Sequence, residues 1–151
     1  MENFIYSIPT TIYFGKGQIE HVSQAVRPYG KKALIVYGGG SVKKNGIFDR
    51  VTEILEHEGI AWEELGGVEP NPRIETVRKG AEFCKAGNIE VVLPIGGGST
   101  IDCAKIIAAG ALYDGDAWDL VLDGKKISCK RNNLASVCLM GGIERCCFFH
   151  R

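Results

Sequence analysis

The sequence predicts an α/β fold in which a parallel β-sheet is covered by helices on both faces. Two observations support this prediction. Short apolar runs alternate with segments of helical periodicity along most of the 151 residues, and this alternation is typical of parallel sheets. The run IEVVLPI (residues 89–95) is apolar at nearly every position, which is the pattern of a strand buried on both faces. The length suits a single domain.

The first strand, helix and second strand are expected within the first 37 residues. The runs TTIYF (10–14) and KALIVY (32–37) are rich in β-branched, aromatic and apolar residues, and each is followed by glycine. Both features predict strands. Residues 17–30 lie between them and repeat apolar side chains at helical spacing, namely Ile19, Val22 and Val26. We therefore expect a helix with one buried face.

A second helix and a third strand follow. Apolar residues recur at spacings of three and four up to Gly59, and they are Ile47, Phe48, Val51, Ile54 and Leu55. This spacing predicts an amphipathic helix. The run IAWEEL (60–65) then mixes apolar and polar positions in the manner of a half-buried strand.

Two further helices are expected on either side of the run 89–95. Their apolar positions are Ile74, Val77, Ala81 and Cys84 in the first and Ile101, Ala104, Ile106 and Ala108 in the second. Ligands of parallel sheets bind beyond the carboxyl ends of the strands. The segments that follow residues 37 and 95 are therefore the expected binding edge.

Charge and hydropathy argue against two classes of partner. The chain has 18 basic and 18 acidic residues without a block of either sign, so we expect no nucleic-acid partner. The amino terminus lacks a basic region followed by a long apolar stretch, and no 18 apolar residues are consecutive. We therefore expect no membrane association and a cytoplasmic location.

The six cysteines are unevenly distributed. Cys84 and Cys103 lie on patterned segments, whereas Cys129, Cys138, Cys146 and Cys147 fall within the last 23 residues. A zinc site or a disulfide framework usually shows paired spacings such as C-x-x-C. The spacings here do not supply them, so neither is predicted.

Two glycine runs, GGGS at 38–41 and at 96–99, lie at the expected binding edge. Glycine lets a backbone approach a phosphate closely, and the amide groups at the start of the following helix favour negative charge. Ser99 is expected to cap the helix and to donate a hydrogen bond to a phosphate. Tight turn geometry alone would also explain one such run, but two at the same edge favour a phosphate site. Asp102, expected in the first helical turn, is explained equally well as a capping residue.

Four motifs together resemble the amino-terminal domain of the iron-containing alcohol dehydrogenases. They are FGKG (14–17), YGGGSVKKNG (37–46), GGVEPNPR (66–73) and GGGSTIDCAK (96–105). The resemblance covers residues 3–127 and is nearest to the NADPH-dependent butanol dehydrogenase and aldehyde reductase branch. It implies a Rossmann-like parallel sheet, and the spacing of four motifs is more specific than any single glycine run.

The resemblance implies a role for each of these positions. Gly96, Gly97, Gly98 and Ser99 match the loop that binds the pyrophosphate of the cofactor. Asp102 matches an acid near the nicotinamide, and Asn71 matches a residue beside the adenosine.

The first glycine run bears on the choice of cofactor. Gly38 stands where NAD-using relatives carry an aspartate, and Gly39, Gly40 and Ser41 continue the run. An acid would repel a 2′-phosphate, so small residues with Lys43 and Lys44 nearby favour NADP(H). Alternatively, the two lysines are simply the solvated start of a helix.

The chain departs from the family after residue 127. Family members continue into a helical domain whose aspartate and three histidines bind divalent iron or zinc. This chain has only His21, His57 and His150, none with a partner at ligand spacing. We expect residues 1–127 to form the NADP-binding domain and the metal-binding domain to be absent. Residues 128–151 are expected to be an atypical tail, non-native or disordered, arising from a shift of reading frame or from genuine divergence.

Two classes of function follow from this reading. The resemblance implies an NADP(H)-dependent alcohol dehydrogenase or aldehyde reductase, of which this chain is the cofactor-binding portion and has no catalytic residue of its own. The alternative is a catalytically inactive nucleotide-binding or self-associating fragment. A flavodoxin-like binder of another phosphate ligand is a third reading. The resemblance also implies a homodimer through the amino-terminal strand NFIYSI (3–8).

Overall fold

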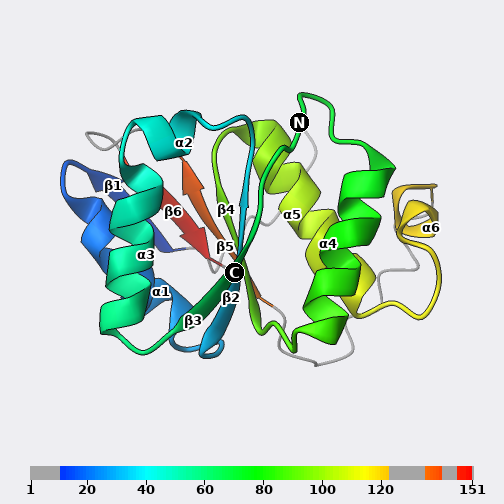
Figure 1. Cartoon of the computed structure of the whole chain (residues 1–151), viewed down its shortest axis with the longest axis horizontal. Helices are drawn as coiled ribbons and strands as arrows, with labels where there is room; N and C mark the ends of the chain where they lie inside the picture. Colours follow the sequence, from blue (N-terminus) through cyan, green and yellow to red (C-terminus); the bar gives the residue numbers. More distant parts are fainter. Residues whose placement is uncertain (1–10, 123–134, 141–145, 151) are drawn as a thin grey trace, which may run out of the picture.

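The computed structural model describes residues 11–122, 135–140 and 146–150, and the strands among them form one six-stranded sheet. Along the sheet the strands run in the order β1-β6-β5-β4-β2-β3. Their bounds are β1 Thr11–Gly15, β2 Lys32–Tyr37, β3 Ala61–Leu65, β4 Val91–Ile95, β5 Ala135–Met140 and β6 Cys146–His150. The predicted α/β class is confirmed, and Figure 1 shows helices on both sides of the strands.

The helices begin and end close to the predicted positions where the periodicity was strong. Their bounds are η1 Gln18–His21, α1 Val22–Val26, α2 Ser41–Lys44, α3 Ile47–His57, α4 Ile74–Ala86, α5 Gly98–Ala111 and α6 Ala117–Leu122. The first predicted helix is divided into the 3₁₀ turn η1 and the short helix α1. None of the described helices has the length and apolarity that crossing a bilayer requires.

The sheet is parallel in its centre and antiparallel at one edge. Strand β2 pairs in parallel with β3 and β4, and β4 pairs in parallel with β5. Strand β6 is antiparallel to both β5 and β1. The predicted parallel sheet is confirmed in the centre, and the edge differs because β6 lies antiparallel between β5 and β1.

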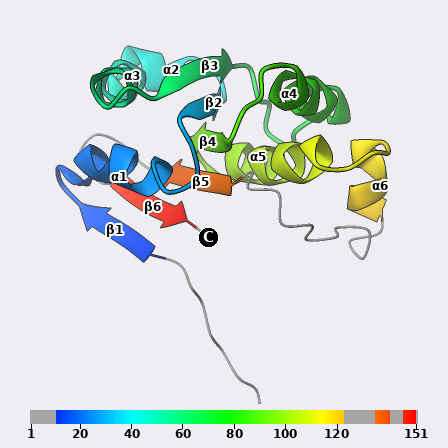
Figure 2. The same cartoon turned by 90° about the horizontal axis from the view of Figure 1, so that it is seen from below.

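The central strands divide the core into two clusters, because successive side chains of a strand point to opposite faces. Along β2, Ile35 and Tyr37 pack in the cluster with α1 and α3, whereas Leu34 and Val36 pack in the cluster with α4 and α5. Figure 2 shows the sheet between these helices. Burial on both faces explains the apolar run predicted for β4.

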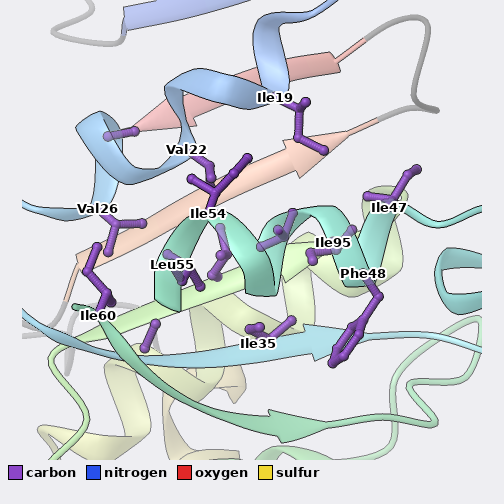
Figure 3. Packing of buried hydrophobic residues seen from close by; sticks show 14 of the residues in the cluster. Ile19, Val22, Val26, Ile35, Ile47, Phe48, Ile54, Leu55, Ile60 and Ile95 are labelled. Carbon is purple, nitrogen blue, oxygen red and sulfur yellow. The ribbon is translucent and has the colours of Figure 1, made fainter. Parts of the chain in front are cut away.

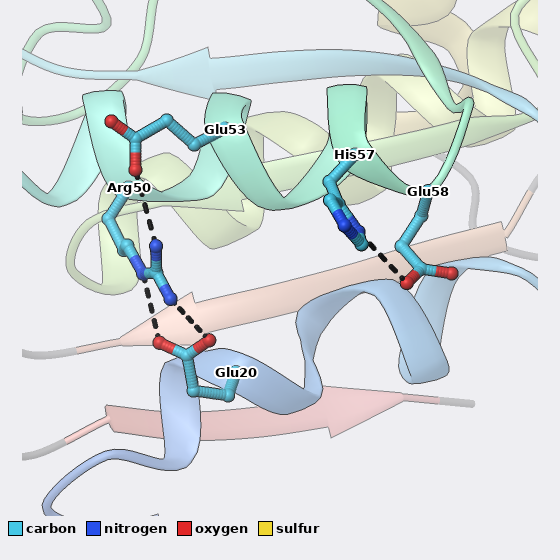
Figure 4. A network of polar contacts seen from close by, with 5 residues as sticks. All are labelled: Glu20, Arg50, Glu53, His57 and Glu58. Atoms are coloured by element: carbon cyan, nitrogen blue, oxygen red, sulfur yellow. Dashed lines mark hydrogen bonds and ion pairs between the residues drawn. The ribbon is translucent and has the colours of Figure 1, made fainter.

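Helix α3 buries the face that the sequence predicted. All five of its expected apolar positions are buried, and Figure 3 shows four of them, Ile47, Phe48, Ile54 and Leu55, among the residues of this cluster. On the outer side, Arg50 donates two hydrogen bonds to Glu20 of η1, at 2.9 and 2.6 Å, and one to Glu53 (Figure 4). These contacts join α3 to the segment that follows β1.

Helices α4 and α5 lie against each other on the opposite face. A Cβ added at Gly80 of α4 would lie 2.5 Å from Cδ1 of Ile107, so the two helices approach closely at this glycine. Ile107 is fully buried, whereas Ile106, the residue predicted for the core, is half-buried. Periodicity could not separate these neighbours because α5 is apolar on most of its surface.

Helix α6 and strands β5 and β6 were also not expected. Helix α6 follows α5, and Arg78 of α4 makes a bidentate ion pair with Asp116 just before it, at 2.8 and 3.0 Å. Strands β5 and β6 fall within residues 128–151, where the sequence showed no clean periodicity. The origin of that tail stays a prediction. The strand predicted for dimer formation, residues 3–8, lies outside the described residues.

Candidate functional site

The two glycine runs lie side by side at the carboxyl edge of the sheet. Strands β2 and β4 are adjacent and parallel, and Tyr37 is paired with Ile95, so each run leaves the sheet at the same level. After β2 the chain leads to α3 on one face, and after β4 it leads to α5 on the other. Ligands bind where neighbouring connections diverge in this way.

Three glycines at this edge have no explanation within the described structure. At Gly39, Gly97 and Gly98 an added Cβ would meet no atom within 4 Å, and none of the three has a positive φ. Every other glycine in the described ranges either has a positive φ or would place its Cβ within 3.4 Å of another atom. The open space beside these three would let a ligand come into close contact with the backbone.

The remaining glycines of the two runs serve the fold itself. A Cβ at Gly38 would lie 3.2 Å from the carbonyl oxygen of Val68, and one at Gly96 would lie 2.7 Å from Oγ1 of Thr100. Gly40 has a φ of 22°. Gly38 is thus small for a packing reason, in addition to any role in cofactor choice.

Helix α5 presents its amino terminus to the edge. Gly97 is the N-cap, with an extended ψ of −169°, and no side chain caps the helix. The first amide groups of a helix have no partner within it and carry partial positive charge. Ser99, expected to be the N-cap, is instead the second helical residue and is half-buried, because the chain already enters the helix at Gly98.

Thr100 is a residue of this site that sequence reasoning missed. Its side chain is only 6% exposed. Its Oγ1 would lie 2.7 Å from a Cβ at Gly96 and 3.8 Å from one at Gly38. The hydroxyl therefore lies between the two glycine runs, and only the pairing of β2 with β4 brings these segments together.

Asp102 lies farther along α5 than predicted. The first turn of the helix contains no acidic residue, so Asp102 is not the capping residue that the sequence allowed. Its side chain is 71% exposed, and Oδ1 lies 3.8 Å from Nζ of Lys105. The carboxylate is accessible one turn above the glycines.

The segment after β3 lies beside the end of β2, next to the first glycine run. The amides of Gly67 and Val68 donate to the carbonyl oxygens of Gly38 and Tyr37, at 3.2 and 3.1 Å. This segment continues to Asn71, which is exposed and has a φ of 58°. The structure therefore brings the segment containing Asn71 to the strand end that begins the first glycine run.

Lys43, predicted as a free donor at this edge, is held by an acid. Its Nζ donates to Oε2 of Glu64 at 2.7 Å, and the hydroxyl of Tyr37 donates to the same oxygen at 3.0 Å. The ammonium also lies 4.5 Å from the ring centre of Phe48. The hydrogen bond from Lys43 lowers the pKa of Glu64, and the same bond raises the pKa of Lys43. Lys43 is thus more than a solvated residue at a helix start.

Metal ligands were expected to be absent from this chain. Within the described ranges, no group of three His, Cys, Asp or Glu side chains could hold a metal ion. His21 stacks on the ring of Tyr13, with 4.7 Å between ring centres, and its Nδ1 donates a hydrogen bond to Oε1 of Gln24 at 3.0 Å. His57 lies beside Glu58 on the surface (Figure 4).

The sequence is similar to a known family over most of its length. A family model described as "Iron-containing alcohol dehydrogenase" matches residues 9–140. The chain is 59% identical over 128 residues to NADH-dependent butanol dehydrogenase A of Clostridium acetobutylicum, covering 85% of this chain and 33% of that protein. It is 41% identical over 128 residues to the NADPH-dependent aldehyde reductase YqhD of Escherichia coli, covering 83% and 32%.

Solved structures show the same fold. The crystal structure of NADH-dependent butanol dehydrogenase A from Thermotoga maritima superimposes with a TM-score of 0.81 at 38% identity, covering 94% of this chain and 39% of that one. The chain spans about a third of the length of the curated relatives it matches.

Proposed function

Because the chain belongs to the iron-containing alcohol dehydrogenase family, we propose that its glycine-rich edge binds a nicotinamide dinucleotide for the interconversion of alcohols and aldehydes. The observation that carries the proposal is the open space at Gly39, Gly97 and Gly98, which the described fold does not require. A backbone without Cβ atoms beside a helix amino terminus suits a pyrophosphate. The residues present therefore fit the cofactor.

The proposed contacts come from the second glycine run, from helix α5 and from the segment after β3. Gly97, Gly98 and the first amides of α5 would bind the pyrophosphate, with Ser99 and Thr100 as hydroxyl donors. Asp102 would lie toward the nicotinamide and Asn71 toward the adenosine, as the family resemblance implies. The bound nicotinamide supplies or accepts the hydride. These side chains bind and orient it.

The described residues do not fit a metal ion, since no three ligand side chains converge within them. The proposal for this chain is accordingly confined to cofactor binding. The activity on alcohols and aldehydes is proposed for the whole protein, because the chain spans only about a third of the relatives' length.

For the choice of cofactor, we propose that the edge accepts NADPH as well as NADH. Small residues at 38–41 leave no acid in the first run, and Gly39 opens onto free space. The relatives differ in the cofactor that their names give: the relative that is 59% identical is named NADH-dependent, and the one that is 41% identical is named NADPH-dependent. Both cofactors are therefore needed in any test.

Replacement of Gly98 by valine tests the proposal. The new Cβ would meet no atom within 4 Å outside its own helix backbone and chain neighbours, so we expect an unchanged fold and a loss of about 10- to 100-fold in affinity for NADH and NADPH, equivalent to 1–3 kcal/mol of steric cost. Titration calorimetry measures the affinity, and circular dichroism checks the fold.

The matched control is Ala86→Val, at the exposed end of α4, in the segment that leads to the start of β4. This variant is expected to bind like the wild type. Equal affinities in wild type and Gly98→Val would show that the run serves folding only. Thermal protection of the wild type by FMN, but by neither dinucleotide, would favour the flavodoxin-like reading instead.

A further inference from the structure

One ion pair connects the first glycine run to the neighbouring strand. Lys43 lies two residues after Ser41, Tyr37 immediately precedes Gly38, and both side chains donate to Oε2 of Glu64 on β3. Side chains from two other elements, β2 and α2, therefore meet at one carboxylate of β3. The side chains of Lys43 and Glu64 are each 42% exposed, so a bound molecule could reach them.

The pair is tied in place by its surroundings. The ammonium of Lys43 lies 4.5 Å from the centre of the Phe48 ring and 5.1 Å from that of Tyr37, distances at which a cation is attracted to an aromatic face. A Cβ at Gly66 would lie 2.6 Å from the Tyr37 ring, so this ring packs against the chain directly after β3. Tyr37 and Glu64 are thereby held at the carboxyl ends of β2 and β3.

Lys43 and Glu64 would favour different forms of an adenosine ribose, the one with a 2′-phosphate and the one with a free 2′-hydroxyl. A 2′-phosphate needs cationic donors and is repelled by a carboxylate, whereas a free 2′-hydroxyl donates readily to a carboxylate. Within the described residues, Oε1 of Glu64 receives no hydrogen bond. Lys43, the ammonium that follows the first run most closely, is at the same time neutralised by Glu64.

We propose that Glu64 determines cofactor selectivity, because it withholds Lys43 from a 2′-phosphate and offers its own oxygen to a 2′-hydroxyl. This inference rests on the proposed dinucleotide site and adds the residue that discriminates between its two forms. The carboxylate belongs to the strand beside the glycine run, where it is separated from Lys43 by 21 residues in sequence.

Two nucleotides that represent only the adenosine half serve as probes. 5′-AMP carries the free 2′-hydroxyl, and 2′,5′-ADP carries the 2′-phosphate. In Glu64→Gln the amide oxygen can still accept from Tyr37, but the negative charge is lost and Lys43 is released. We expect the affinity for 2′,5′-ADP to rise about tenfold relative to that for 5′-AMP, as gain of one charge-assisted contact would produce.

A second variant removes the cation. Lys43→Gln is expected to abolish the gain when it is combined with Glu64→Gln, so the double variant should return to the wild-type ratio of the two affinities. The preference of Glu64→Gln for 2′,5′-ADP should also weaken as salt is raised, because it is a charge interaction at an exposed site.

Glu63→Gln provides the matched control. Glu63 is the neighbouring residue on β3 and pairs with Lys32 at 2.8 Å, with both side chains 34% exposed. Lys32 is the first residue of β2 and Tyr37, beside the glycine run, is the last, so this pair lies away from the proposed ribose site. Its loss should leave the ratio of affinities unchanged. Both probes are titrated by calorimetry against the three variants, namely Glu64→Gln, Lys43→Gln/Glu64→Gln and Glu63→Gln, and against the wild type.

The ratio of the affinities for the two probes distinguishes the outcomes. The inference is supported if the affinity for 2′,5′-ADP relative to that for 5′-AMP rises in Glu64→Gln but not in Glu63→Gln or in the double variant. The same ratio in Glu64→Gln and Glu63→Gln overturns it, while the proposed function stands as long as the wild type binds either probe. If the wild type binds none of the four compounds, namely 5′-AMP, 2′,5′-ADP, NADH and NADPH, both the proposed function and this inference are overturned.

Discussion

Cys84 of α4 and Cys103 of α5 are buried in the apolar cluster between these helices and the sheet. Burial raises the pKa of Cys84 to about 12, with a smaller contribution from Glu63, and burial raises the pKa of Cys103 to about 11. An anionic sulfur would have to lose its hydration in this cluster. Both thiols therefore stay protonated well above the pH at which a free cysteine ionises.

Stability should consequently depend on pH through these thiols. Their pKa is raised in the folded state, so their contribution is complete below about pH 9, the unfolded value, and is lost as the pH rises towards 11 and 12. At pH 10 we expect a loss of roughly 1 kcal/mol in the free energy of unfolding for each thiol. Urea unfolding at pH 8, 9 and 10 measures it.

The control for this prediction is the Cys84→Ala/Cys103→Ala variant. Lysine and tyrosine side chains also titrate near pH 10, so the effect of the thiols is the difference between the two pH profiles. Parallel profiles for variant and wild type would contradict the prediction.

At the scale of elements, the contact between α4 and α5 depends on one glycine. Alanine at Gly80 would place its Cβ 2.5 Å from Cδ1 of Ile107 and 3.0 Å from Cδ2 of Leu65. Alanine favours a helix by about 1 kcal/mol over glycine, but overpacking of a core costs about 1–3 kcal/mol. We expect Gly80→Ala to lower the free energy of unfolding despite its better helix propensity, as measured by urea denaturation.

A second substitution separates the clash from other causes. Ile107→Val removes the Cδ1 atom that the new Cβ would meet. In the Gly80→Ala background it should therefore cost less than it does in the wild type, where it only leaves a small void. Strictly additive effects of the two substitutions would show that the helices do not meet as described.

Helices and strands with strong periodicity were predictable from the sequence. The other elements and pairings were not predicted, for reasons that the structure identifies. The bounds of α3 and α4 follow from apolar residues on one face only. Helices α2 and α6 are too short, at four and six residues, for a helical period to be visible. The antiparallel pairing of β1 with β6 joins opposite ends of the chain, and no local pattern encodes such a pairing.

The candidate site was likewise predictable from the sequence only in part. The two glycine runs were visible because each is contiguous in sequence. The sequence could not show which of these glycines the fold itself needs, since that depends on Val68 and Thr100 from other segments. The partnership of Lys43 with Glu64 also required the pairing of β2 with β3.

At the scale of the whole molecule, binding and turnover are expected to separate. A protein of these 151 residues should bind a dinucleotide but show no measurable reduction of butanal with NADH or NADPH, with or without added Fe²⁺ or Zn²⁺. Loss of even one preorganised group that stabilises developing charge costs about 10²- to 10³-fold in rate, and the chain spans only about a third of its relatives' length. Loss of NADH or NADPH absorbance measures the rate.

The positive control is the full-length butanol dehydrogenase A of Clostridium acetobutylicum, assayed with NADH and butanal under the same conditions. Metal-dependent turnover by the 151-residue protein at a comparable rate would show that these residues suffice for catalysis.

The pairing of Thr11 of β1 with His150 of β6 has a consequence for synthesis on the ribosome. Translation proceeds at about 5–20 residues per second, so β1 emerges roughly 10 s before its partner strand exists. Ile12 and Phe14, still 56% and 69% exposed in the finished sheet, are uncovered throughout that interval. An unpaired strand with apolar side chains is a template for other chains, so the nascent protein exposes an edge open to aggregation until β6 has been made.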